Sequence, residues 1–154
     1  MENGEKVEIE LAGLSDYFGY QLRQAQTASF RDLASPFRKL GISPGEFSLL
    51  TIVQANPEIR QTDLIRIYRL DKSTMSVAVN RLVERGLISR KKLPKDRRFH
   101  GLTLTRAGRQ LLTTATGVVE EQEKRMASAL SSDEWEIAIS ALRRIAVHLK
   151  IENN

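Results

Sequence analysis

The residues able to do chemistry in this 154-residue chain are mostly cations, with 24 Lys and Arg against 19 Asp and Glu and a net charge of +5. The chain has no Cys, which excludes disulfides, thiolate metal sites and thiol redox sensing. Its two histidines, His100 and His148, lie far apart, and it has no nucleophile elbow, phosphate-binding Gly loop or zinc-protease motif. We therefore expect neither an enzyme nor a metal or cofactor site.

The cations gather in one stretch of the chain. From Arg85 to Arg109 there are nine Lys or Arg and a single acid, Asp96. Such clustering is typical of a surface that neutralises nucleic-acid phosphates in a salt-dependent way. We assign this role to Arg90, Lys91, Lys92, Lys95, Arg97 and Arg98. The alternative interpretation is a solvated basic loop with one chance acid.

The acid within this stretch needs a reason, because it weakens the attraction of the loop for a polyanion. Asp96 precedes Arg98 by two residues, so across a tight turn its carboxylate can hold the guanidinium in a fixed orientation. We expect Arg98 to enter the minor groove of duplex DNA and to sense its width and A·T content.

A hairpin and two helices must position these cations. The predicted hairpin covers residues 87–105 and turns at residues 93–96. The predicted helices before it cover residues 61–68 and 72–85 and are joined by a short turn. Helix, turn, helix and hairpin is the layout of a winged helix-turn-helix.

The second of these helices has one apolar and one polar side. Met75, Val79 and Leu82 recur at i, i+4 and i+7 and share a face, and Gly86 is placed to end the helix. Short hydrogen-bonding side chains on the other faces would let the backbone approach base edges in a major groove. The residues that we expect to contact DNA are Lys72, Ser73, Thr74, Ser76, Val77, Asn80 and Arg81.

The segment GLISRKKLPKDRRFHGLTLTRAG resembles the wing of MarR-family transcriptional regulators. The resemblance rests on Arg85-Gly86-Leu87-Ile88, on the Asp96-x-Arg98 pair and on Leu104-Thr105-x-x-Gly108. It extends over nearly the whole chain, because a long predicted helix precedes this region and two follow it. The resemblance implies a homodimer that binds a near-palindromic double-stranded DNA operator and usually responds to a small molecule.

Val77 departs from the family pattern, since many relatives have a long polar residue there, often Arg. A Val side chain offers only a methyl contact, for example to a thymine. Part of the operator specificity is therefore expected from Asn80, Arg81 or the wing.

The expected fold is mainly α with a small β-hairpin wing, a winged helix-turn-helix with flanking dimerisation helices. We predict a single MarR-like domain over residues 1–154, with a DNA-binding lobe at 44–105 and dimerisation helices at 10–40 and 106–151. The first helix should run from Leu14 to Leu40, and Pro36 should kink or split it.

Two capping boxes and an apolar last helix complete the helix predictions. Ser43 and Glu46 predict a capping box at the start of the second helix, and Ser131 and Glu134 predict another. The broad apolar stripe of the helix that follows Ser131 predicts packing against a partner subunit.

Aromatic and cationic side chains lie together in the first predicted helix. The resemblance places an effector between the dimerisation helices and the lobe, where the first two helices meet the fifth. An Arg there could pair with the carboxylate of an aromatic acid or a phosphate of an acyl-CoA, while rings pack against the apolar part. The candidates are Tyr17, Tyr20, Arg23, Phe30 and Arg31. Alternatively, both arginines lie on a solvated face or form salt bridges in the dimer.

No apolar run approaches membrane-spanning length and the first five residues form no signal peptide, so we expect a cytoplasmic protein without a membrane partner. Our hypothesis is a dimeric repressor released by a small ligand such as an aromatic acid or its CoA thioester. An activator, or a regulator without an effector, is an alternative in the same class. A nonspecific architectural DNA-binding protein is an alternative in another class and would bind with little sequence preference.

Overall fold

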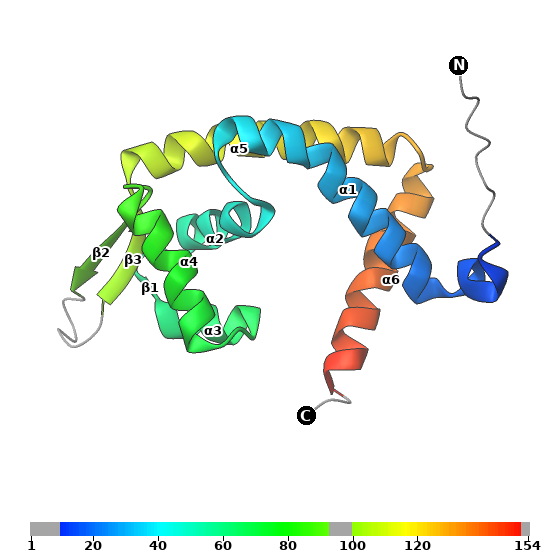
Figure 1. The fold of residues 1–154 in the computed structure, drawn as a ribbon, viewed down its shortest axis with the longest axis horizontal. Coiled ribbons are helices and arrows are strands. Elements are labelled where there is room, and N and C mark those ends of the chain that lie inside the picture. Colours follow the sequence, from blue (N-terminus) through cyan, green and yellow to red (C-terminus); the bar gives the residue numbers. More distant parts are fainter. Residues whose placement is uncertain (1–9, 93–99, 152–154) are drawn as a thin grey trace, which may run out of the picture.

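The structure, a computed structural model, describes residues 10–92 and 100–151 (Figure 1). It is mainly α with one small antiparallel sheet, which confirms the expected fold class. In chain order its elements are η1 (Ala12–Asp16), α1 (Phe18–Leu40), α2 (Pro44–Ala55), β1 (Ile59–Arg60), α3 (Gln61–Tyr68), α4 (Lys72–Glu84), β2 (Ile88–Lys92), β3 (His100–Leu104), α5 (Arg106–Ala127) and α6 (Ser132–Ile151).

The elements from α2 to β3, which we call the lobe (Figure 1), form the buried apolar core together with Leu33 and Phe37 of α1 and Leu112 and Ala115 of α5. Leu50 of α2 and Leu64 of α3 are 0% exposed, and the predicted apolar face of α4 is confirmed, because Met75, Val79 and Leu82 are also 0% exposed. Burying such side chains contributes roughly 1.5–3 kcal/mol each to folding. The position of α4 in the lobe is therefore fixed by its buried face.

The sheet has three strands in the order β1-β3-β2. The predicted hairpin is confirmed as β2 and β3, which pair in register from Ile88 opposite Leu104 to Lys92 opposite His100. The third strand, β1, was not predicted, because two residues are too few to show a periodicity. It forms only through pairing of Ile59 with Leu102 and of Arg60 with Gly101.

Local capping signals in the sequence correctly predict the start of α2, the end of α4 and the start of α6. The capping box of α2 is present, with the Glu46 N–H donating to Ser43 Oγ at 3.2 Å and the Ser43 N–H donating to Glu46 Oε2 at 2.8 Å. The chain leaves α4 through Gly86 at φ +68°, a left-handed conformation that glycine adopts at little cost. The second predicted box is present too, since the Glu134 N–H donates to Ser131 Oγ at 3.3 Å and the Ser131 N–H donates to Glu134 Oε2 at 2.8 Å.

The first helix corrects one expectation and narrows another. The chain is interrupted at Tyr17, so residues Ala12–Asp16 form the separate 3-10 helix η1 rather than the start of α1. Of the two effects expected of Pro36, the split does not occur, because α1 runs through it to Leu40. Leu33 and Phe37, on either side of Pro36, are 6% and 2% exposed, and their burial against the lobe outweighs the one backbone hydrogen bond that proline removes.

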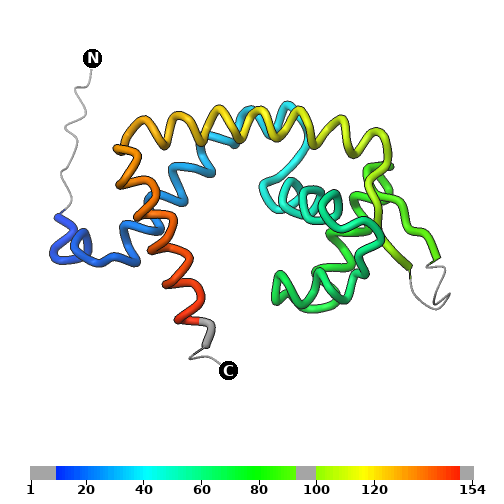
Figure 2. Tube along the Cα trace, turned by 180° about the vertical axis from the view of Figure 1, so that it is seen from behind, coloured from blue at the N-terminus to red at the C-terminus, as the bar shows by residue number. Residues whose placement is uncertain are grey.

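Helix α5 connects the lobe to the far end of the molecule, and α1 packs along it (Figures 1 and 2). A buried amide joins the two helices, since Gln122 Nε2 donates to the backbone oxygen of Ser29 at 2.7 Å and to Asp32 Oδ2 at 3.0 Å. Asp32 also accepts a hydrogen bond from Arg125. These two bonds, that from Arg125 first, hold the pKa of Asp32 below its ordinary value.

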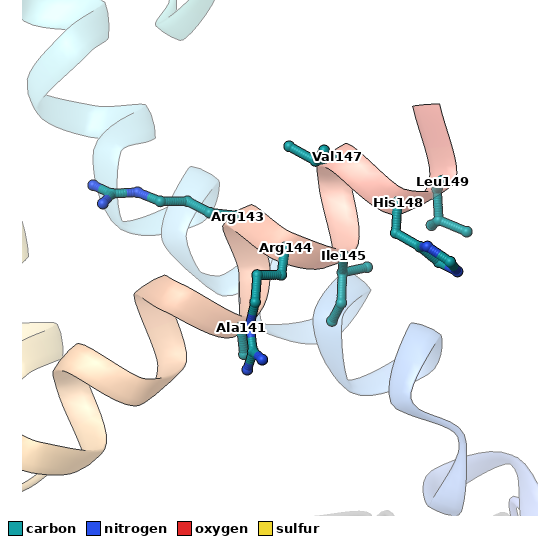
Figure 3. Close-up of a pocket in the computed structure, with 7 residues that line it drawn as sticks. All are labelled: Ala141, Arg143, Arg144, Ile145, Val147, His148 and Leu149. Atoms are coloured by element: carbon teal, nitrogen blue, oxygen red, sulfur yellow. The ribbon is translucent and has the colours of Figure 1, made fainter. Parts of the chain in front are cut away.

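At the far end of α5 the chain exposes apolar side chains. We call residues 12–30 and 132–149 the arms. Phe18 is 60% exposed and Ile137 66% exposed, and no described residue of α6 is buried. Figure 3 shows the side chains that line one pocket at this surface, and all of them project from α6. These residues are Ala141, Arg143, Arg144, Ile145, Val147, His148 and Leu149.

Over residues 10–92 and 100–151, no helix combines the length and apolar character that a membrane crossing needs.

Candidate nucleic-acid interface

Helix α4 begins at a fully engaged cap. Asp71 accepts hydrogen bonds from the Thr74 N–H at 2.8 Å, from Thr74 Oγ1 at 2.6 Å and from the Ser73 hydroxyl. The bonds from Ser73 and Thr74, in that order, lower the pKa of Asp71. Because both hydroxyl hydrogens point to Asp71, Ser73 and Thr74 present acceptor oxygens, rather than donors, to a ligand beside α4.

The outer side of α4 is available for contact along its length. Val77 is 69% exposed, and Ser76 is half-buried. The other predicted contact residues of this helix are all exposed, namely Lys72, Ser73, Thr74, Asn80 and Arg81. A helix whose inner face is fixed and whose outer face is short and polar has the shape that a major groove accepts.

Gln61 links this helix to the wing, a role that the sequence did not reveal. Its Nε2 donates to Ser76 Oγ at 2.7 Å, and its Oε1 accepts from Arg90 Nη2 at 3.2 Å. The link orients both residues and leaves the Ser76 hydroxyl hydrogen available to a partner. Since Gln61 lies fifteen residues before Ser76, no helical periodicity could have indicated the contact.

The described part of the wing presents cations beside α4. Arg90, Lys91 and Lys92 are exposed on β2, and Ser89 Oγ lies 2.9 Å from Thr103 Oγ1 across the hairpin. The predicted tip residues Lys95, Asp96, Arg97 and Arg98 lie outside the described residues, so their roles remain predictions.

Two arginines at the end of α4 meet a carboxylate from α2. Glu46 Oε1 lies 3.1 Å from Arg85 Nη1 and 3.4 Å from Arg81 Nε. From the sequence, Glu46 was expected only in the capping box, because the ion pairs join residues more than 30 positions apart. Arg81 is thereby held at the exposed side of α4.

The predicted effector residues do not all come together within one chain. A groove of about 540 Å³ lies between α1 and the start of α2, and Phe30 lines it together with Leu33, Phe37 and Arg38. Tyr17, Tyr20, Arg23 and Arg31 are not among its lining residues, so the cation at this groove is Arg38.

The residues that could do other chemistry are dispersed. Within the described ranges, no three His, Asp or Glu side chains meet in a way that could hold a metal ion. What the described surface offers is hydrogen bonding, methyl contact and positive charge.

Comparison with known proteins gives a consistent result. The family model described as "MarR family" matches residues 42–100. A putative transcriptional regulatory protein for the hcr operon of Thauera aromatica is 31% identical over 144 residues, which span 93% of this chain and 87% of that protein.

Two solved structures of one repressor are similar over almost their whole length. The transcriptional repressor CouR bound to a 23-mer DNA duplex is 32% identical with a TM-score of 0.83, and the match covers 90% of this chain and 99% of that one. CouR bound to p-coumaroyl-CoA is 30% identical with a TM-score of 0.80, over 90% and 98% of the two chains.

Proposed function

The chain belongs to the MarR family of transcriptional regulators, and we propose that it is a dimeric repressor that binds a near-palindromic DNA operator and releases it when a small ligand binds. The observation that supports this proposal most directly is the geometry of α4. Its inner face is fully buried in the lobe, while its outer, small polar face lies beside the exposed cations of β2.

In this proposal α4 is the recognition helix. Two such helices in a dimer would enter successive major grooves about 34 Å apart. Val77, as the most exposed apolar side chain of α4, would contact a thymine methyl group, while Asn80 and Ser76 supply donors to base edges. Arg90, Lys91 and Lys92 would neutralise phosphates, together with the cations of the wing tip.

The arms are the proposed dimer interface. The exposed apolar residues of the arms include Leu14, Phe18, Leu22, Ile137, Leu142 and Val147. A single chain leaves this surface in water, whereas a partner chain that covers it removes apolar area from solvent at roughly 25 cal/mol per Å².

The groove between α1 and α2 is the proposed effector site. Its apolar lining suits an aromatic ring, and Arg38 offers a partner for a carboxylate or a phosphate. CouR, to which this chain is similar, was solved with an aromatic acyl-CoA, which supports the same ligand class here. Ser43 and Gly45 of the α2 turn also line this groove, so a ligand there touches the turn that leads into Glu46.

A titration with DNA tests the proposal. A duplex from the intergenic region upstream of the gene and a scrambled duplex would be titrated at two salt concentrations, with and without aromatic acids and acyl-CoAs. We expect tight binding to the first duplex only, and loss of that binding with one ligand class. Equal affinity for both duplexes, fading uniformly with salt, would favour the nonspecific architectural alternative.

Two variants assign the contact surface. Arg90→Ala should weaken operator binding and reduce the slope of log affinity against log salt by about 1, because one phosphate contact is lost. Lys124→Ala removes the same charge near the other end of α5, where its ammonium pairs with the exposed Glu121, and should leave the affinity unchanged. Equal effects of the two variants would show that net charge, not this surface, governs binding.

A further inference from the structure

The capping box holds the carboxylate of Glu46 in place independently of its ion pairs with arginine. The residue is 6% exposed, and its Oε2 accepts the Ser43 N–H at 2.8 Å within the capping box. The other oxygen, Oε1, faces α4 and contacts both Arg81 and Arg85. A buried, hydrogen-bonded carboxylate at the end of a short side chain is a rigid anchor for a guanidinium.

The two arginines use this anchor differently. The Arg85 side chain is 30% exposed and also donates from Nη2 to the backbone oxygen of Gly41 at 2.6 Å, so it joins α4 to the end of α1. The Arg81 side chain is 69% exposed and meets Glu46 through Nε. A guanidinium carries five N–H donors, so Arg81 retains its Nη donors for an anion outside the protein. Arg85 is structural, whereas Arg81 is presented outward.

We propose that Glu46 is a positioning residue for DNA binding: it holds the Arg81 guanidinium in the orientation in which its Nη groups contact the operator. The inference rests on the proposed function, in which α4 enters the major groove. An arginine in solution samples many rotamers, and the loss of this freedom on binding opposes affinity. The Glu46 carboxylate at Nε restricts the Arg81 side chain already in the free protein, so less entropy is lost on binding. The same carboxylate also repels the phosphates of DNA, which opposes this gain.

Charge and positioning make opposite predictions for Glu46→Gln. Glutamine also serves at this position of a capping box, so the start of α2 is retained while the ion pairs are lost. The substitution raises the net charge by one, and charge alone would tighten DNA binding. Loss of positioning should instead weaken binding to the selected operator duplex about 10-fold. Unchanged or tighter binding would overturn the inference.

A double-mutant cycle with Arg81→Ala separates positioning from a general effect on the fold. If Glu46 acts through Arg81, Glu46→Gln should weaken binding about 10-fold in the wild type and change it less than about 2-fold in the Arg81→Ala protein. An equal loss in both backgrounds would mean that Glu46 acts through Arg85 and the packing of α2, which also overturns the inference.

Glu121→Gln is the matched control. It makes the same chemical change and breaks an ion pair, because Glu121 Oε1 lies 2.6 Å from Lys124 Nζ, but it lies near the other end of α5. Operator affinity should stay within about 2-fold of wild type. A loss as large as that of Glu46→Gln would assign the effect to the general loss of an acid and not to Arg81.

Circular dichroism of each variant would show whether it folds. If Glu46→Gln does not fold, Glu46→Asp enters the same cycle, because it keeps the charge but withdraws the carboxylate by one methylene from Arg81. The wild-type titration distinguishes failure of the proposed function from failure of this inference. If the wild type binds both duplexes equally, the proposed function and the inference are both overturned. If the wild type binds the operator selectively but the effects of Glu46→Gln and Arg81→Ala are additive, only the inference is overturned.

Discussion

Large apolar side chains are buried in the lobe of this chain and exposed in its arms. In the lobe, Leu50, Leu64 and Leu82 are 0% exposed, so the core is completed by one chain. In the arms, Phe18 and Ile137 are 60% and 66% exposed, although they too are large apolar side chains on helices. The difference indicates that one chain completes the packing of the lobe against α1 and α5, whereas the exposed apolar side chains of the arms need a second surface to be buried.

The largest expected effect tests whether the lobe core carries the stability of the chain. Leu82→Ala should lower the free energy of unfolding by about 2–5 kcal/mol, because it leaves a cavity at a fully buried site. Urea unfolding followed by circular dichroism measures it. Val77→Ala, on the exposed side of the same helix, should change stability by less than about 0.5 kcal/mol. A loss equally small for Leu82→Ala would contradict the contrast between lobe and arms.

The next effect tests the arms. Ile137→Asp places a charge on the exposed apolar face of α6 and should weaken dimer formation about 100-fold, since burying an unpaired carboxylate is costly. Light scattering should then give the mass of one chain at concentrations where the wild type is a dimer. Ile67→Asp, on the lobe at 54% exposed, is the matched control and should keep the dimer mass. A dimer in both variants would remove α6 from the interface.

A smaller effect tests the junction between the two regions. At the start of α5, a Cβ added to Gly108 would lie 2.1 Å from the backbone oxygen of Leu87. Gly108→Ala should therefore destabilise the chain by about 1–3 kcal/mol, because backbone atoms must shift. Gly117→Ala, in the same helix with nothing within 4 Å, should stabilise it by about 0.5–1 kcal/mol. Thermal unfolding of the two variants gives the comparison, and equal shifts would contradict it.

The smallest effect concerns the edge of the lobe at low pH. Hydrogen bonds from Ser73 and Thr74 lower the pKa of Asp71 below its ordinary value of 3.8. The stabilisation by the ionised group is complete above pH 3.8 and is lost as the pH falls through the folded-state pKa. Asp71→Asn keeps a cap acceptor but does not titrate. The melting temperature of the wild type should fall more steeply than that of the variant on acidification, and parallel slopes would contradict the role of Asp71.

Much of the lobe could be predicted because its signals are local. A cap three residues from its partner, as at Ser43 and Glu46, and apolar residues one turn apart, as at Met75 and Val79, report on contacts within one element. A local signal did not settle the split considered at Pro36, since burial of Leu33 and Phe37 on either side keeps α1 continuous. The continuity of α1 therefore depends on packing between elements and not on the local sequence.

The site was predicted less completely than the fold, because its polar contacts join distant parts of the chain. Gln61 reaches Ser76 and Arg90, and Glu46 reaches Arg81 and Arg85, across separations that no periodicity reports. The sequence was enough to predict the exposed face of α4. It was not enough to predict the polar contacts that hold the side chains of that face in place. Arg38, which lines the α1–α2 groove, was not singled out from the sequence, although the residues that form the groove are close together in the chain.

Helix α5 passes without interruption from the wing to the arms. Its 22 residues make a rod about 33 Å long, at 1.5 Å per residue. A rod of this length acts as a lever: a tilt of about 5° at the arms moves the other end by roughly 3 Å, close to the rise of one base pair. A small change in the packing of the arms would therefore move the lobe end of α5 by nearly the rise of one base pair.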